Sequence, residues 1–223
     1  MKVKERLEEV RERIQKAAII ADRNPDEVSI LGATKGVDPE RIEEAIEAGL
    51  HLLGENRVQE AERKIPLVRG NAEWHMIGHL QRNKVKKALR LFSMIQSVDS
   101  LKLAQEINRR AETPFEVLIE VNTSMEPQKH GVKPEETESL VEKCLNLENL
   151  KLRGLMTLGP YPPSEKNSRK AFALLRELRD KIQEKFAIDL PILSMGMTED
   201  FEWAVMEGAT IVRIGRAIFG ERS

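Results

Sequence analysis

Apolar and charged residues alternate with a helical period at the start of the chain. In residues 3–22 the apolar side chains recur every three or four positions, with charged residues between them. This spacing gathers the apolar side chains on one face of a helix. We therefore predict an amphipathic helix over residues 3–22, which ends before Asn24-Pro25. Its apolar positions are Val3, Leu7, Val10, Ile14, Ala17, Ala18 and Ala21.

Short apolar runs then alternate with helical segments along the rest of the chain. Each run has the length of a buried strand, and residues typical of helix starts or helical spacing follow it. Asp38-Pro39-Glu40 offers an N-cap, a proline at the first helical position and an early negative charge, and Asp99-Ser100 offers a second cap. The runs begin at Val28, His51, Glu73, Met94, Phe115, Leu152, Ile192 and Thr210. The predicted helices between them cover residues 39–48, 56–68, 83–91, 99–111, 134–147, 168–186 and 198–207.

This alternation predicts the fold. Strands that are each separated from the next by a helix favour an α/β protein, and eight of them favour a closed parallel (β/α)8 barrel of the TIM-barrel type. The helix over residues 3–22 would then be an N-terminal addition. An open doubly wound sheet is the alternative, because it also alternates strands with helices. We expect residues 1–223 to form one domain, since no linker or low-complexity segment interrupts the pattern.

Charge and composition narrow the classes of function. Lys and Arg total 36, Asp and Glu total 37, and the formal net charge is -1, so the balance favours neither nucleic acid nor an anionic membrane as a partner. Aromatic residues make up 4% of the chain, which argues against a base-stacking surface. The single cysteine, Cys144, lies on a predicted amphipathic helix and is expected in the core rather than as a nucleophile. Because we find neither a signal-peptide pattern nor a long apolar run, we expect a cytoplasmic protein.

In such a barrel, functional side chains come from the carboxyl ends of the strands. Lys35 ends the first strand, where a lysine either points into solvent or, when partly buried, becomes an amine suited to Schiff-base chemistry. Asn56 and His79 follow the second and third strands. The loops after the seventh and eighth strands combine hydroxyls, glycines and a predicted helix start at Thr198, which is typical of a phosphate site. The candidate residues in these two loops are Ser194, Met195, Gly196, Thr198, Arg213, Gly215 and Arg216.

The sequence also resembles a known family at these positions. The matching runs are Gly32 to Lys35, Gly54 to Glu60, Trp74 to Lys84, Val121-Asn122, Lys129 to Gly131, Gly154 to Thr157, Leu193 to Thr198 and Val212 to Gly220. They extend over nearly the whole chain in one order. They resemble the pyridoxal-phosphate homeostasis protein family, whose fold is similar to the barrel domain of alanine racemase. Gly36-Val37-Asp38 departs from the usual family pattern, so the contacts of this loop are not carried over.

The resemblance implies a role for several of these residues. Lys35 would carry pyridoxal 5'-phosphate as a Schiff base, and Arg213 would meet the pyridine nitrogen of this cofactor. A permanent positive charge beside that nitrogen makes the ring a weaker electron sink. The phosphate would be held by Ser194, Thr198 and the backbone N–H groups of Gly215 and Arg216, with Met195 and Gly196 in the same loop as Ser194.

The sequence allows two roles each for Asn56 and His79. Asn56 either packs near the cofactor ring or caps the helix that follows the second strand. His79 either lines the pocket or is a structural histidine. His75 and His79 lie four residues apart, but a strand with an intervening glycine does not supply the helical geometry that a metal pair needs. No metal site is therefore expected.

Two functions remain after the resemblance is taken into account. The first is a carrier that holds pyridoxal phosphate on Lys35 without robust catalysis, maintains its intracellular balance and passes it to pyridoxal-phosphate-dependent apoenzymes, as a monomer or weak dimer. The second is an amino-acid racemase, which needs an acid/base group on each face of the substrate carbon. Tyr161 is the one tyrosine of the chain, and its proline-rich surroundings favour a stiff surface loop over a catalytic lid. We therefore expect the carrier; an interaction module with a vestigial pocket is a third alternative.

Overall fold

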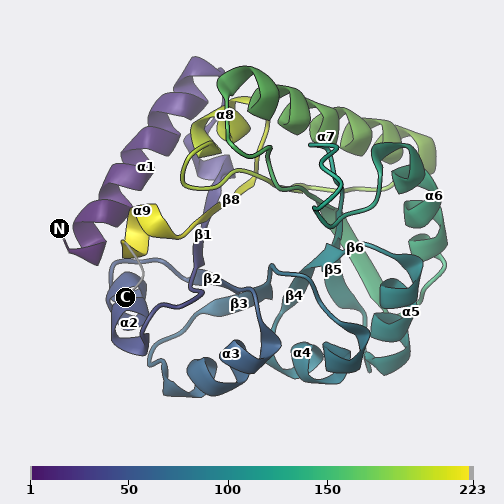
Figure 1. The fold of residues 1–223 in the computed structure, drawn as a ribbon, viewed down its shortest axis with the longest axis horizontal. Helices are drawn as coiled ribbons and strands as arrows, with labels where there is room; N and C mark the ends of the chain where they lie inside the picture. Colours follow the sequence, from purple (N-terminus) through teal and green to yellow (C-terminus); the bar gives the residue numbers. More distant parts are fainter. Residues whose placement is uncertain (1, 221–223) are drawn as a thin grey trace.

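The computed structural model describes residues 2–220, in which a closed barrel of parallel strands is surrounded by helices (Figure 1). Each strand pairs with its neighbours in chain order, and β1 pairs with β8 from Ser29 against Ile211 to Gly32 against Ile214. The predicted (β/α)8 barrel is confirmed, because this last pairing closes the sheet that the alternative fold would leave open. The strands are β1 (Ser29–Ala33), β2 (Leu52–Glu55), β3 (Glu73–Met76), β4 (Met94–Val98), β5 (Phe115–Glu120), β6 (Leu150–Met156), β7 (Ile192–Ser194) and β8 (Ile211–Ile214).

Helices follow the strands and bury their apolar faces against the outside of the barrel. Short 3-10 turns precede β1 (Pro25–Glu27), follow α3 (Ile65–Leu67) and precede α4 (Arg82–Lys84). Within residues 2–220, no helix combines the length and apolar character that crossing a membrane requires. The helices are α2 (Pro39–Glu47), α3 (Val58–Lys64), α4 (Val85–Leu91), α5 (Leu101–Arg110), α6 (Pro134–Leu145), α7 (Glu165–Phe186), α8 (Phe201–Met206) and α9 (Arg216–Phe219).

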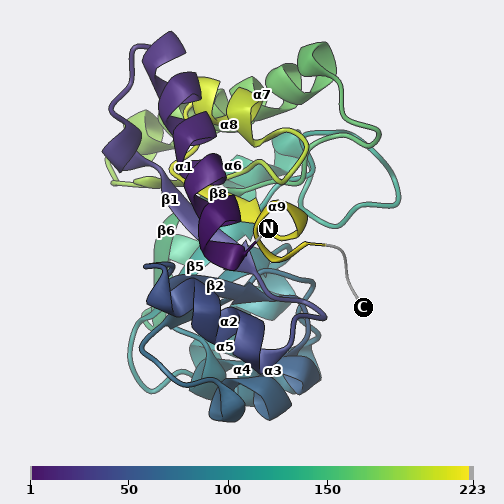
Figure 2. The same ribbon diagram turned by 90° about the vertical axis from the view of Figure 1, so that its left-hand side faces the viewer.

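The predicted N-terminal helix is α1 (Val3–Ile20), which lies on the outside of the barrel at the seam between β8 and β1 (Figures 1 and 2). It contacts α2, α8 and α9. The helices α8 and α9 have only six and four residues, so α1 completes the helical layer that they leave short. Its buried side chains are Val3, Leu7, Val10, Ile14, Ala17 and Ala18.

Several of the predicted helix starts differ from the structure; α7, for example, begins at Glu165 rather than at Ser168. The helix predicted from Thr198 begins at Phe201, because Asp200 Oδ1 accepts a hydrogen bond from Met197 N at 2.6 Å and closes a turn ahead of the helix. Thr198 therefore lies in that turn, and its assignment to a helix start is wrong. The N-cap residue of α3 is Arg57, so the interpretation of Asn56 as that cap is also wrong.

Side-chain capping is weaker than the sequence suggested. Asp38 and Ser100 occupy the N-cap positions of α2 and α5, but neither side chain makes a capping hydrogen bond. The Asp99 carboxylate instead lies 3.2 Å from His79 Nδ1. The short helix α9 was not predicted, because four residues are too few for helical periodicity to show.

Candidate functional site

A cavity of about 490 Å³ opens at the carboxyl ends of the strands. It lies where functional residues of this fold are expected, and loops from opposite sides of the barrel contribute to its wall. The predicted site residues that line it are Lys35, Asn56, His79, Thr198, Arg213, Gly215 and Arg216. Ser194, Met195 and Gly196 are buried and do not line it.

Lys35 lies in the turn after β1 and is half-buried. The residues on either side of it are fixed: Thr34 N donates to Gly54 O at 3.0 Å, and Gly36 N donates to Glu60 Oε1 at 2.7 Å. Gly36 has φ +68, in the left-handed region that glycine tolerates, and this allows the chain to turn directly after Lys35. The backbone therefore directs the Lys35 side chain into the cavity wall.

A second lysine holds this turn from inside the protein. Lys64 Nζ, which is buried, donates to Thr34 O at 2.6 Å, to Glu55 Oε1 at 2.6 Å and to Glu60 Oε1 at 2.7 Å. Burial raises the pKa of Glu55, against the effect of the hydrogen bonds from Lys64 and Thr34. Burial also acts to raise the pKa of Glu60, but the Gly36 N–H and Lys64 outweigh it and lower that pKa. The two carboxylates and Lys64 thus clamp the backbone around Lys35.

Arg213 comes from β8 and is almost completely buried. It ends a chain of hydrogen bonds through the barrel interior. Arg213 NH1 donates to Ser194 Oγ at 2.7 Å, and Ser194 Oγ donates to Gln96 Oε1 at 2.6 Å. Gln96 Nε2 then contacts His75 Nδ1 at 2.8 Å, and His75 Nε2 contacts Glu73 Oε1 at 2.9 Å.

These contacts fix which atom donates in each hydrogen bond of the series. When Gln96 donates to Nδ1 of His75, the proton of a neutral His75 ring is on Nε2 and points to Glu73. Burial lowers the pKa of His75, against the effect of Glu73, and so favours the neutral ring. These hydrogen bonds therefore orient the Ser194 hydroxyl toward Arg213 rather than toward the cavity.

Buried carboxyl groups lie near Arg213. Glu120 lines the cavity, and its pKa is raised to about 7 by burial and by Asp99, although Arg213 acts in the opposite direction. Asp200 also lines the cavity, and burial raises its pKa despite the hydrogen bond from Met197 N. Burial lowers the pKa of Arg213 to about 10, so the guanidinium stays charged at neutral pH.

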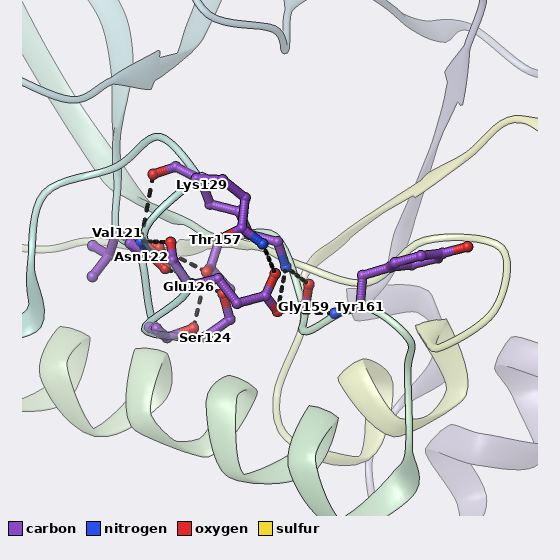
Figure 3. Close-up of polar contacts among 10 residues, drawn as sticks. Val121, Asn122, Ser124, Glu126, Lys129, Thr157, Gly159 and Tyr161 are labelled. Carbon is purple, nitrogen blue, oxygen red and sulfur yellow. Dashed lines mark hydrogen bonds and ion pairs between the residues drawn. The ribbon is translucent and has the colours of Figure 1, made fainter.

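The loops after β5 and β6 meet over one side of the cavity (Figure 3). Lys129 Nζ donates to Gly159 O and, at 3.1 Å, to Glu126 Oε1, which also accepts from Tyr161 N at 3.0 Å. Asn122 Nδ2 closes the first loop by donating to Glu126 O at 2.9 Å. The Tyr161 ring extends away from this network, and 78% of the residue is exposed.

Beside the cavity, a polar groove of about 800 Å³ is lined by residues that follow β2 and β3. Lys35, Asn56, His79 and His130 line both hollows. Gly78 allows this arrangement, because a Cβ atom there would lie 2.4 Å from Asn56 O. The runs that resemble the family after β2 and β3 therefore form one wall.

Sequence reasoning missed several groups at this site, namely Gln96, Asp99, Glu120, Lys129 and His130. Glu120 could have been found, because it is a charged residue at the carboxyl end of a predicted strand, as Lys35 is. Asp99 was assigned to a helix cap, and Gln96 was treated only as part of a strand. Lys129 and His130 lie in a loop whose path over the barrel the hydrophobic pattern does not show.

Comparisons with known proteins match this architecture. The family "Alanine racemase, N-terminal domain" matches residues 6–223. A pyridoxal phosphate homeostasis protein from Aquifex aeolicus is 49% identical over 98% of this chain and 97% of its own length. The protein of the same name from Pseudomonas aeruginosa is 40% identical over 99% of this chain and 96% of its own length.

Solved structures give the same result. PipY of Synechococcus elongatus, whose structure was determined with pyridoxal phosphate bound, is 32% identical and has a TM-score of 0.87, over 98% of this chain and all of that one (100%). Alanine racemase from Clostridium difficile is 17% identical with a TM-score of 0.75, over 94% of this chain and 55% of that one, a likeness of fold alone. The barrel, its cavity and these full-length matches together show that the chain belongs to the pyridoxal phosphate homeostasis protein family, within the family of alanine racemase N-terminal domains.

Proposed function

We propose that this protein binds pyridoxal phosphate in the 490 Å³ cavity, attached through Lys35, and serves in pyridoxal phosphate homeostasis without robust catalysis. The names of its relatives and the ligand of PipY support the identity of the cofactor. One observation carries the proposal for this chain. Lys35, which is half-buried, shares a cavity with Arg213 and with the loops after β7 and β8, about 160 to 180 positions further along the sequence.

The residues of the cavity fit this cofactor. Lys35 offers an amine for the aldehyde, while Thr198, Arg216 and the backbone of Gly215 offer donors and positive charge for the phosphate. Thr198 Oγ1 lies 3.5 Å from Ala217 N, so the loops after β7 and β8 lie against each other. The volume falls within the range of about 300–1,000 Å³ that is usual for small-molecule sites.

When bound, pyridoxal phosphate supplies an aldehyde that bonds to an amine and a ring that withdraws electrons. Arg213 would control that ring. Its guanidinium is charged, it donates to Ser194 Oγ and Thr157 O, and it has no acceptor for a proton. A neutral ring nitrogen is therefore favoured beside it, and the ring draws electrons less strongly than it would beside a carboxylate.

Ser194, Met195 and Gly196 take a supporting role in this proposal. Ser194 Oγ accepts from Arg213 NH1, and Gly196 O accepts from Arg213 N at 2.9 Å. Met195 packs in the core below the same loop. These residues hold Arg213 in position, and the phosphate contacts fall to Thr198, Gly215 and Arg216.

Racemase activity is the second candidate, and Glu120 is the observation that favours it. Its carboxyl lines the cavity with a pKa of about 7, as a general acid or base requires. Tyr161 favours it less, because 78% of the residue is exposed, although it also lines the cavity. Exchange of the α-proton of amino acids in deuterated water tests this candidate. Exchange that requires Lys35 and is lost in Glu120→Gln would replace the carrier proposal, whereas absence of exchange with the cofactor-loaded protein supports the carrier.

Further properties belong to the same proposal. We place the protein in the cytoplasm, with pyridoxal-phosphate-dependent apoenzymes as recipients and a monomer or weak dimer as its assembly state. The single cysteine, Cys144, is buried, and burial raises its pKa to about 12, which agrees with a reduced core thiol. Residues 1–223 are proposed to be one domain, supported by the contacts of α1 with α8 and α9.

The central test uses the protein loaded with pyridoxal phosphate. We expect a visible absorbance band that Lys35→Ala abolishes, and borohydride treatment should add the reduced cofactor to Lys35, as mass spectrometry of peptides can show. Lys102→Ala, on the surface of α5, is the control and should keep the band. A band of equal intensity in Lys35→Ala, or borohydride trapping on another lysine, would refute the attachment through Lys35.

A further inference from the structure

Two histidines and a carboxylate meet at the rim of the cavity. His79 follows β3, Asp99 follows β4, and His130 lies in the loop between β5 and α6. One ligand atom from each residue lies within 4.8 Å of the other two. His79 Nδ1 is 3.2 Å from Asp99 Oδ2, and the ring of His130 stacks on that of His79 with centroids 4.0 Å apart.

We propose that His79, Asp99 and His130 bind a divalent transition-metal ion of the zinc class. Imidazole nitrogens with one carboxylate suit Zn²⁺, Co²⁺ and Ni²⁺, whereas Mg²⁺ and Ca²⁺ prefer oxygen ligands. His75, which the sequence offered as the neighbour of His79, takes no part, because its two ring nitrogens contact Glu73 and Gln96.

The ligand atoms are close to the spacing that such an ion requires. Bonds of about 2.0–2.1 Å in tetrahedral geometry put neighbouring ligand atoms roughly 3.3 Å apart. His79 and Asp99 already have this separation, at 3.2 Å. The two rings are nearly parallel, with an interplanar angle of 11°, and must turn toward one point. Both histidines are exposed, so rotation of their side chains meets little resistance.

The backbone that carries the three side chains is held in place. Ser97 Oγ donates to Gly78 O at 2.7 Å and ties the residue before His79 to the end of β4, next to Asp99. At the base of the loop that carries His130, Val132 N donates to Glu120 O at 2.8 Å. Gly131 has φ +111, and a Cβ atom there would lie 2.7 Å from Asn122 N, so the loop packs closely.

The cluster lies where the cavity and the groove meet, since His79 and His130 line both hollows. A bound ion would therefore join the ends of β3 and β4 to the β5–α6 loop. Three protein ligands leave a coordination position for water or an anion.

Cobalt binding by the untagged full chain, without pyridoxal phosphate, tests the proposal independently of the cofactor. Titration with Co²⁺ should produce visible d–d absorbance that saturates at one equivalent, and Zn²⁺ should displace it. His79→Ala and His130→Ala should each weaken binding by more than about tenfold. His51→Ala is the control, because His51 is exposed and contacts Asn71 O outside the cluster.

Circular dichroism establishes that each variant is folded before titration, and Asp99→Asn provides a third variant if either histidine variant fails to fold. Absence of saturable Co²⁺ absorbance would overturn the proposal. The same affinity in the native chain and in the folded variants would overturn it too, since binding would then occur elsewhere on the surface.

Discussion

At the scale of single residues, the turn that carries Lys35 is held by a second lysine, Lys64, which is buried. Lys64 donates to Thr34 O and to two carboxylates, and the same carboxylates bond to Thr34 and to Gly36. The residues before and after Lys35 are therefore tied to a buried ion-pair network. Such networks cost stability when one partner is removed, because the remaining charge is left without a counter-ion.

We expect Lys64→Met to lower the free energy of unfolding by about 3–5 kcal/mol, because it leaves Glu55 buried without its counter-ion. Urea unfolding measures this change. Lys87→Met is the matched control, since its ion pair with Glu62 is exposed and should be worth less than about 1 kcal/mol. Equal losses in the two variants would contradict the structural role of Lys64.

Glu120 predicts a dependence of stability on pH. Its pKa is raised from 4.5 to about 7 in the folded protein, chiefly by burial, so the folded state holds a proton that the unfolded state has released over this range. Stability from this group is therefore present below about pH 4.5 and is lost as the pH rises to about 7. The loss amounts to about 3 kcal/mol at most.

Glu120→Gln removes this titration. Relative to the native protein, the variant should gain unfolding free energy between pH 5 and 8, as denaturant unfolding at a series of pH values can measure. Curves that run parallel for the two proteins over that range would show that Glu120 does not titrate there.

At the scale of elements, α1 packs on two short helices and buries the part of the barrel surface that they leave uncovered. The barrel seam between β8 and β1 is flanked by α8 and α9, which have six and four residues. The apolar face of α1 covers them, and Leu7 on this face is fully buried. The added helix is thus part of the core rather than an appendage.

Leu7→Ala should destabilise the protein by about 2–5 kcal/mol, because it opens a cavity between α1 and the helices beneath it. Glu9→Ala lies on the exposed face of α1 and should change stability by less than about 0.5 kcal/mol. Thermal unfolding of both variants gives the comparison. A Leu7→Ala variant as stable as Glu9→Ala would mean that α1 is dispensable.

At the scale of the whole molecule, the barrel interior is crossed by one polar chain. Gln96 of β4 contacts Ser194 of β7 and His75 of β3, and Ser194 contacts Arg213 of β8. Because these groups are buried, each needs its partner to offset the loss of hydration. Gln96 is thus the residue on which the position of Arg213 depends from the far side of the barrel.

Gln96→Leu should lower the unfolding free energy by about 1–3 kcal/mol for each polar group that it leaves unpaired. It should also shift the visible absorbance of the cofactor-loaded protein, because Ser194 no longer fixes Arg213. Gln105→Leu, on the exposed side of α5, should change neither property. An unchanged spectrum together with unchanged stability in Gln96→Leu would show that the hydrogen bonds through Gln96 do not position Arg213.

The sequence predicts the barrel well because each element has its own periodicity, and eight strands with intervening helices have few possible arrangements. It also places Lys35, Thr198 and Arg213 near one another, since strand ends in a barrel meet at one face. The sequence does not predict the contacts of a side chain that binds partners from distant strands instead of its neighbours in sequence. Asp99 contacts His79 instead of capping α5, and Ser194 faces Gln96 and Arg213 instead of the cavity. These contacts depend on which distant strands become neighbours, and the hydrophobic periodicity of one segment carries no information about that.

The clamp formed by Lys64 also implies chemical selectivity. Two amines lie near the end of β1, and one of them already donates to three acceptors in a buried site. Its nitrogen is thus enclosed by these acceptors and is shielded from reagents in solution. We therefore expect aldehydes and acylating reagents to modify Lys35, which lines the cavity, and to spare the buried Lys64, although both are lysines at the same turn.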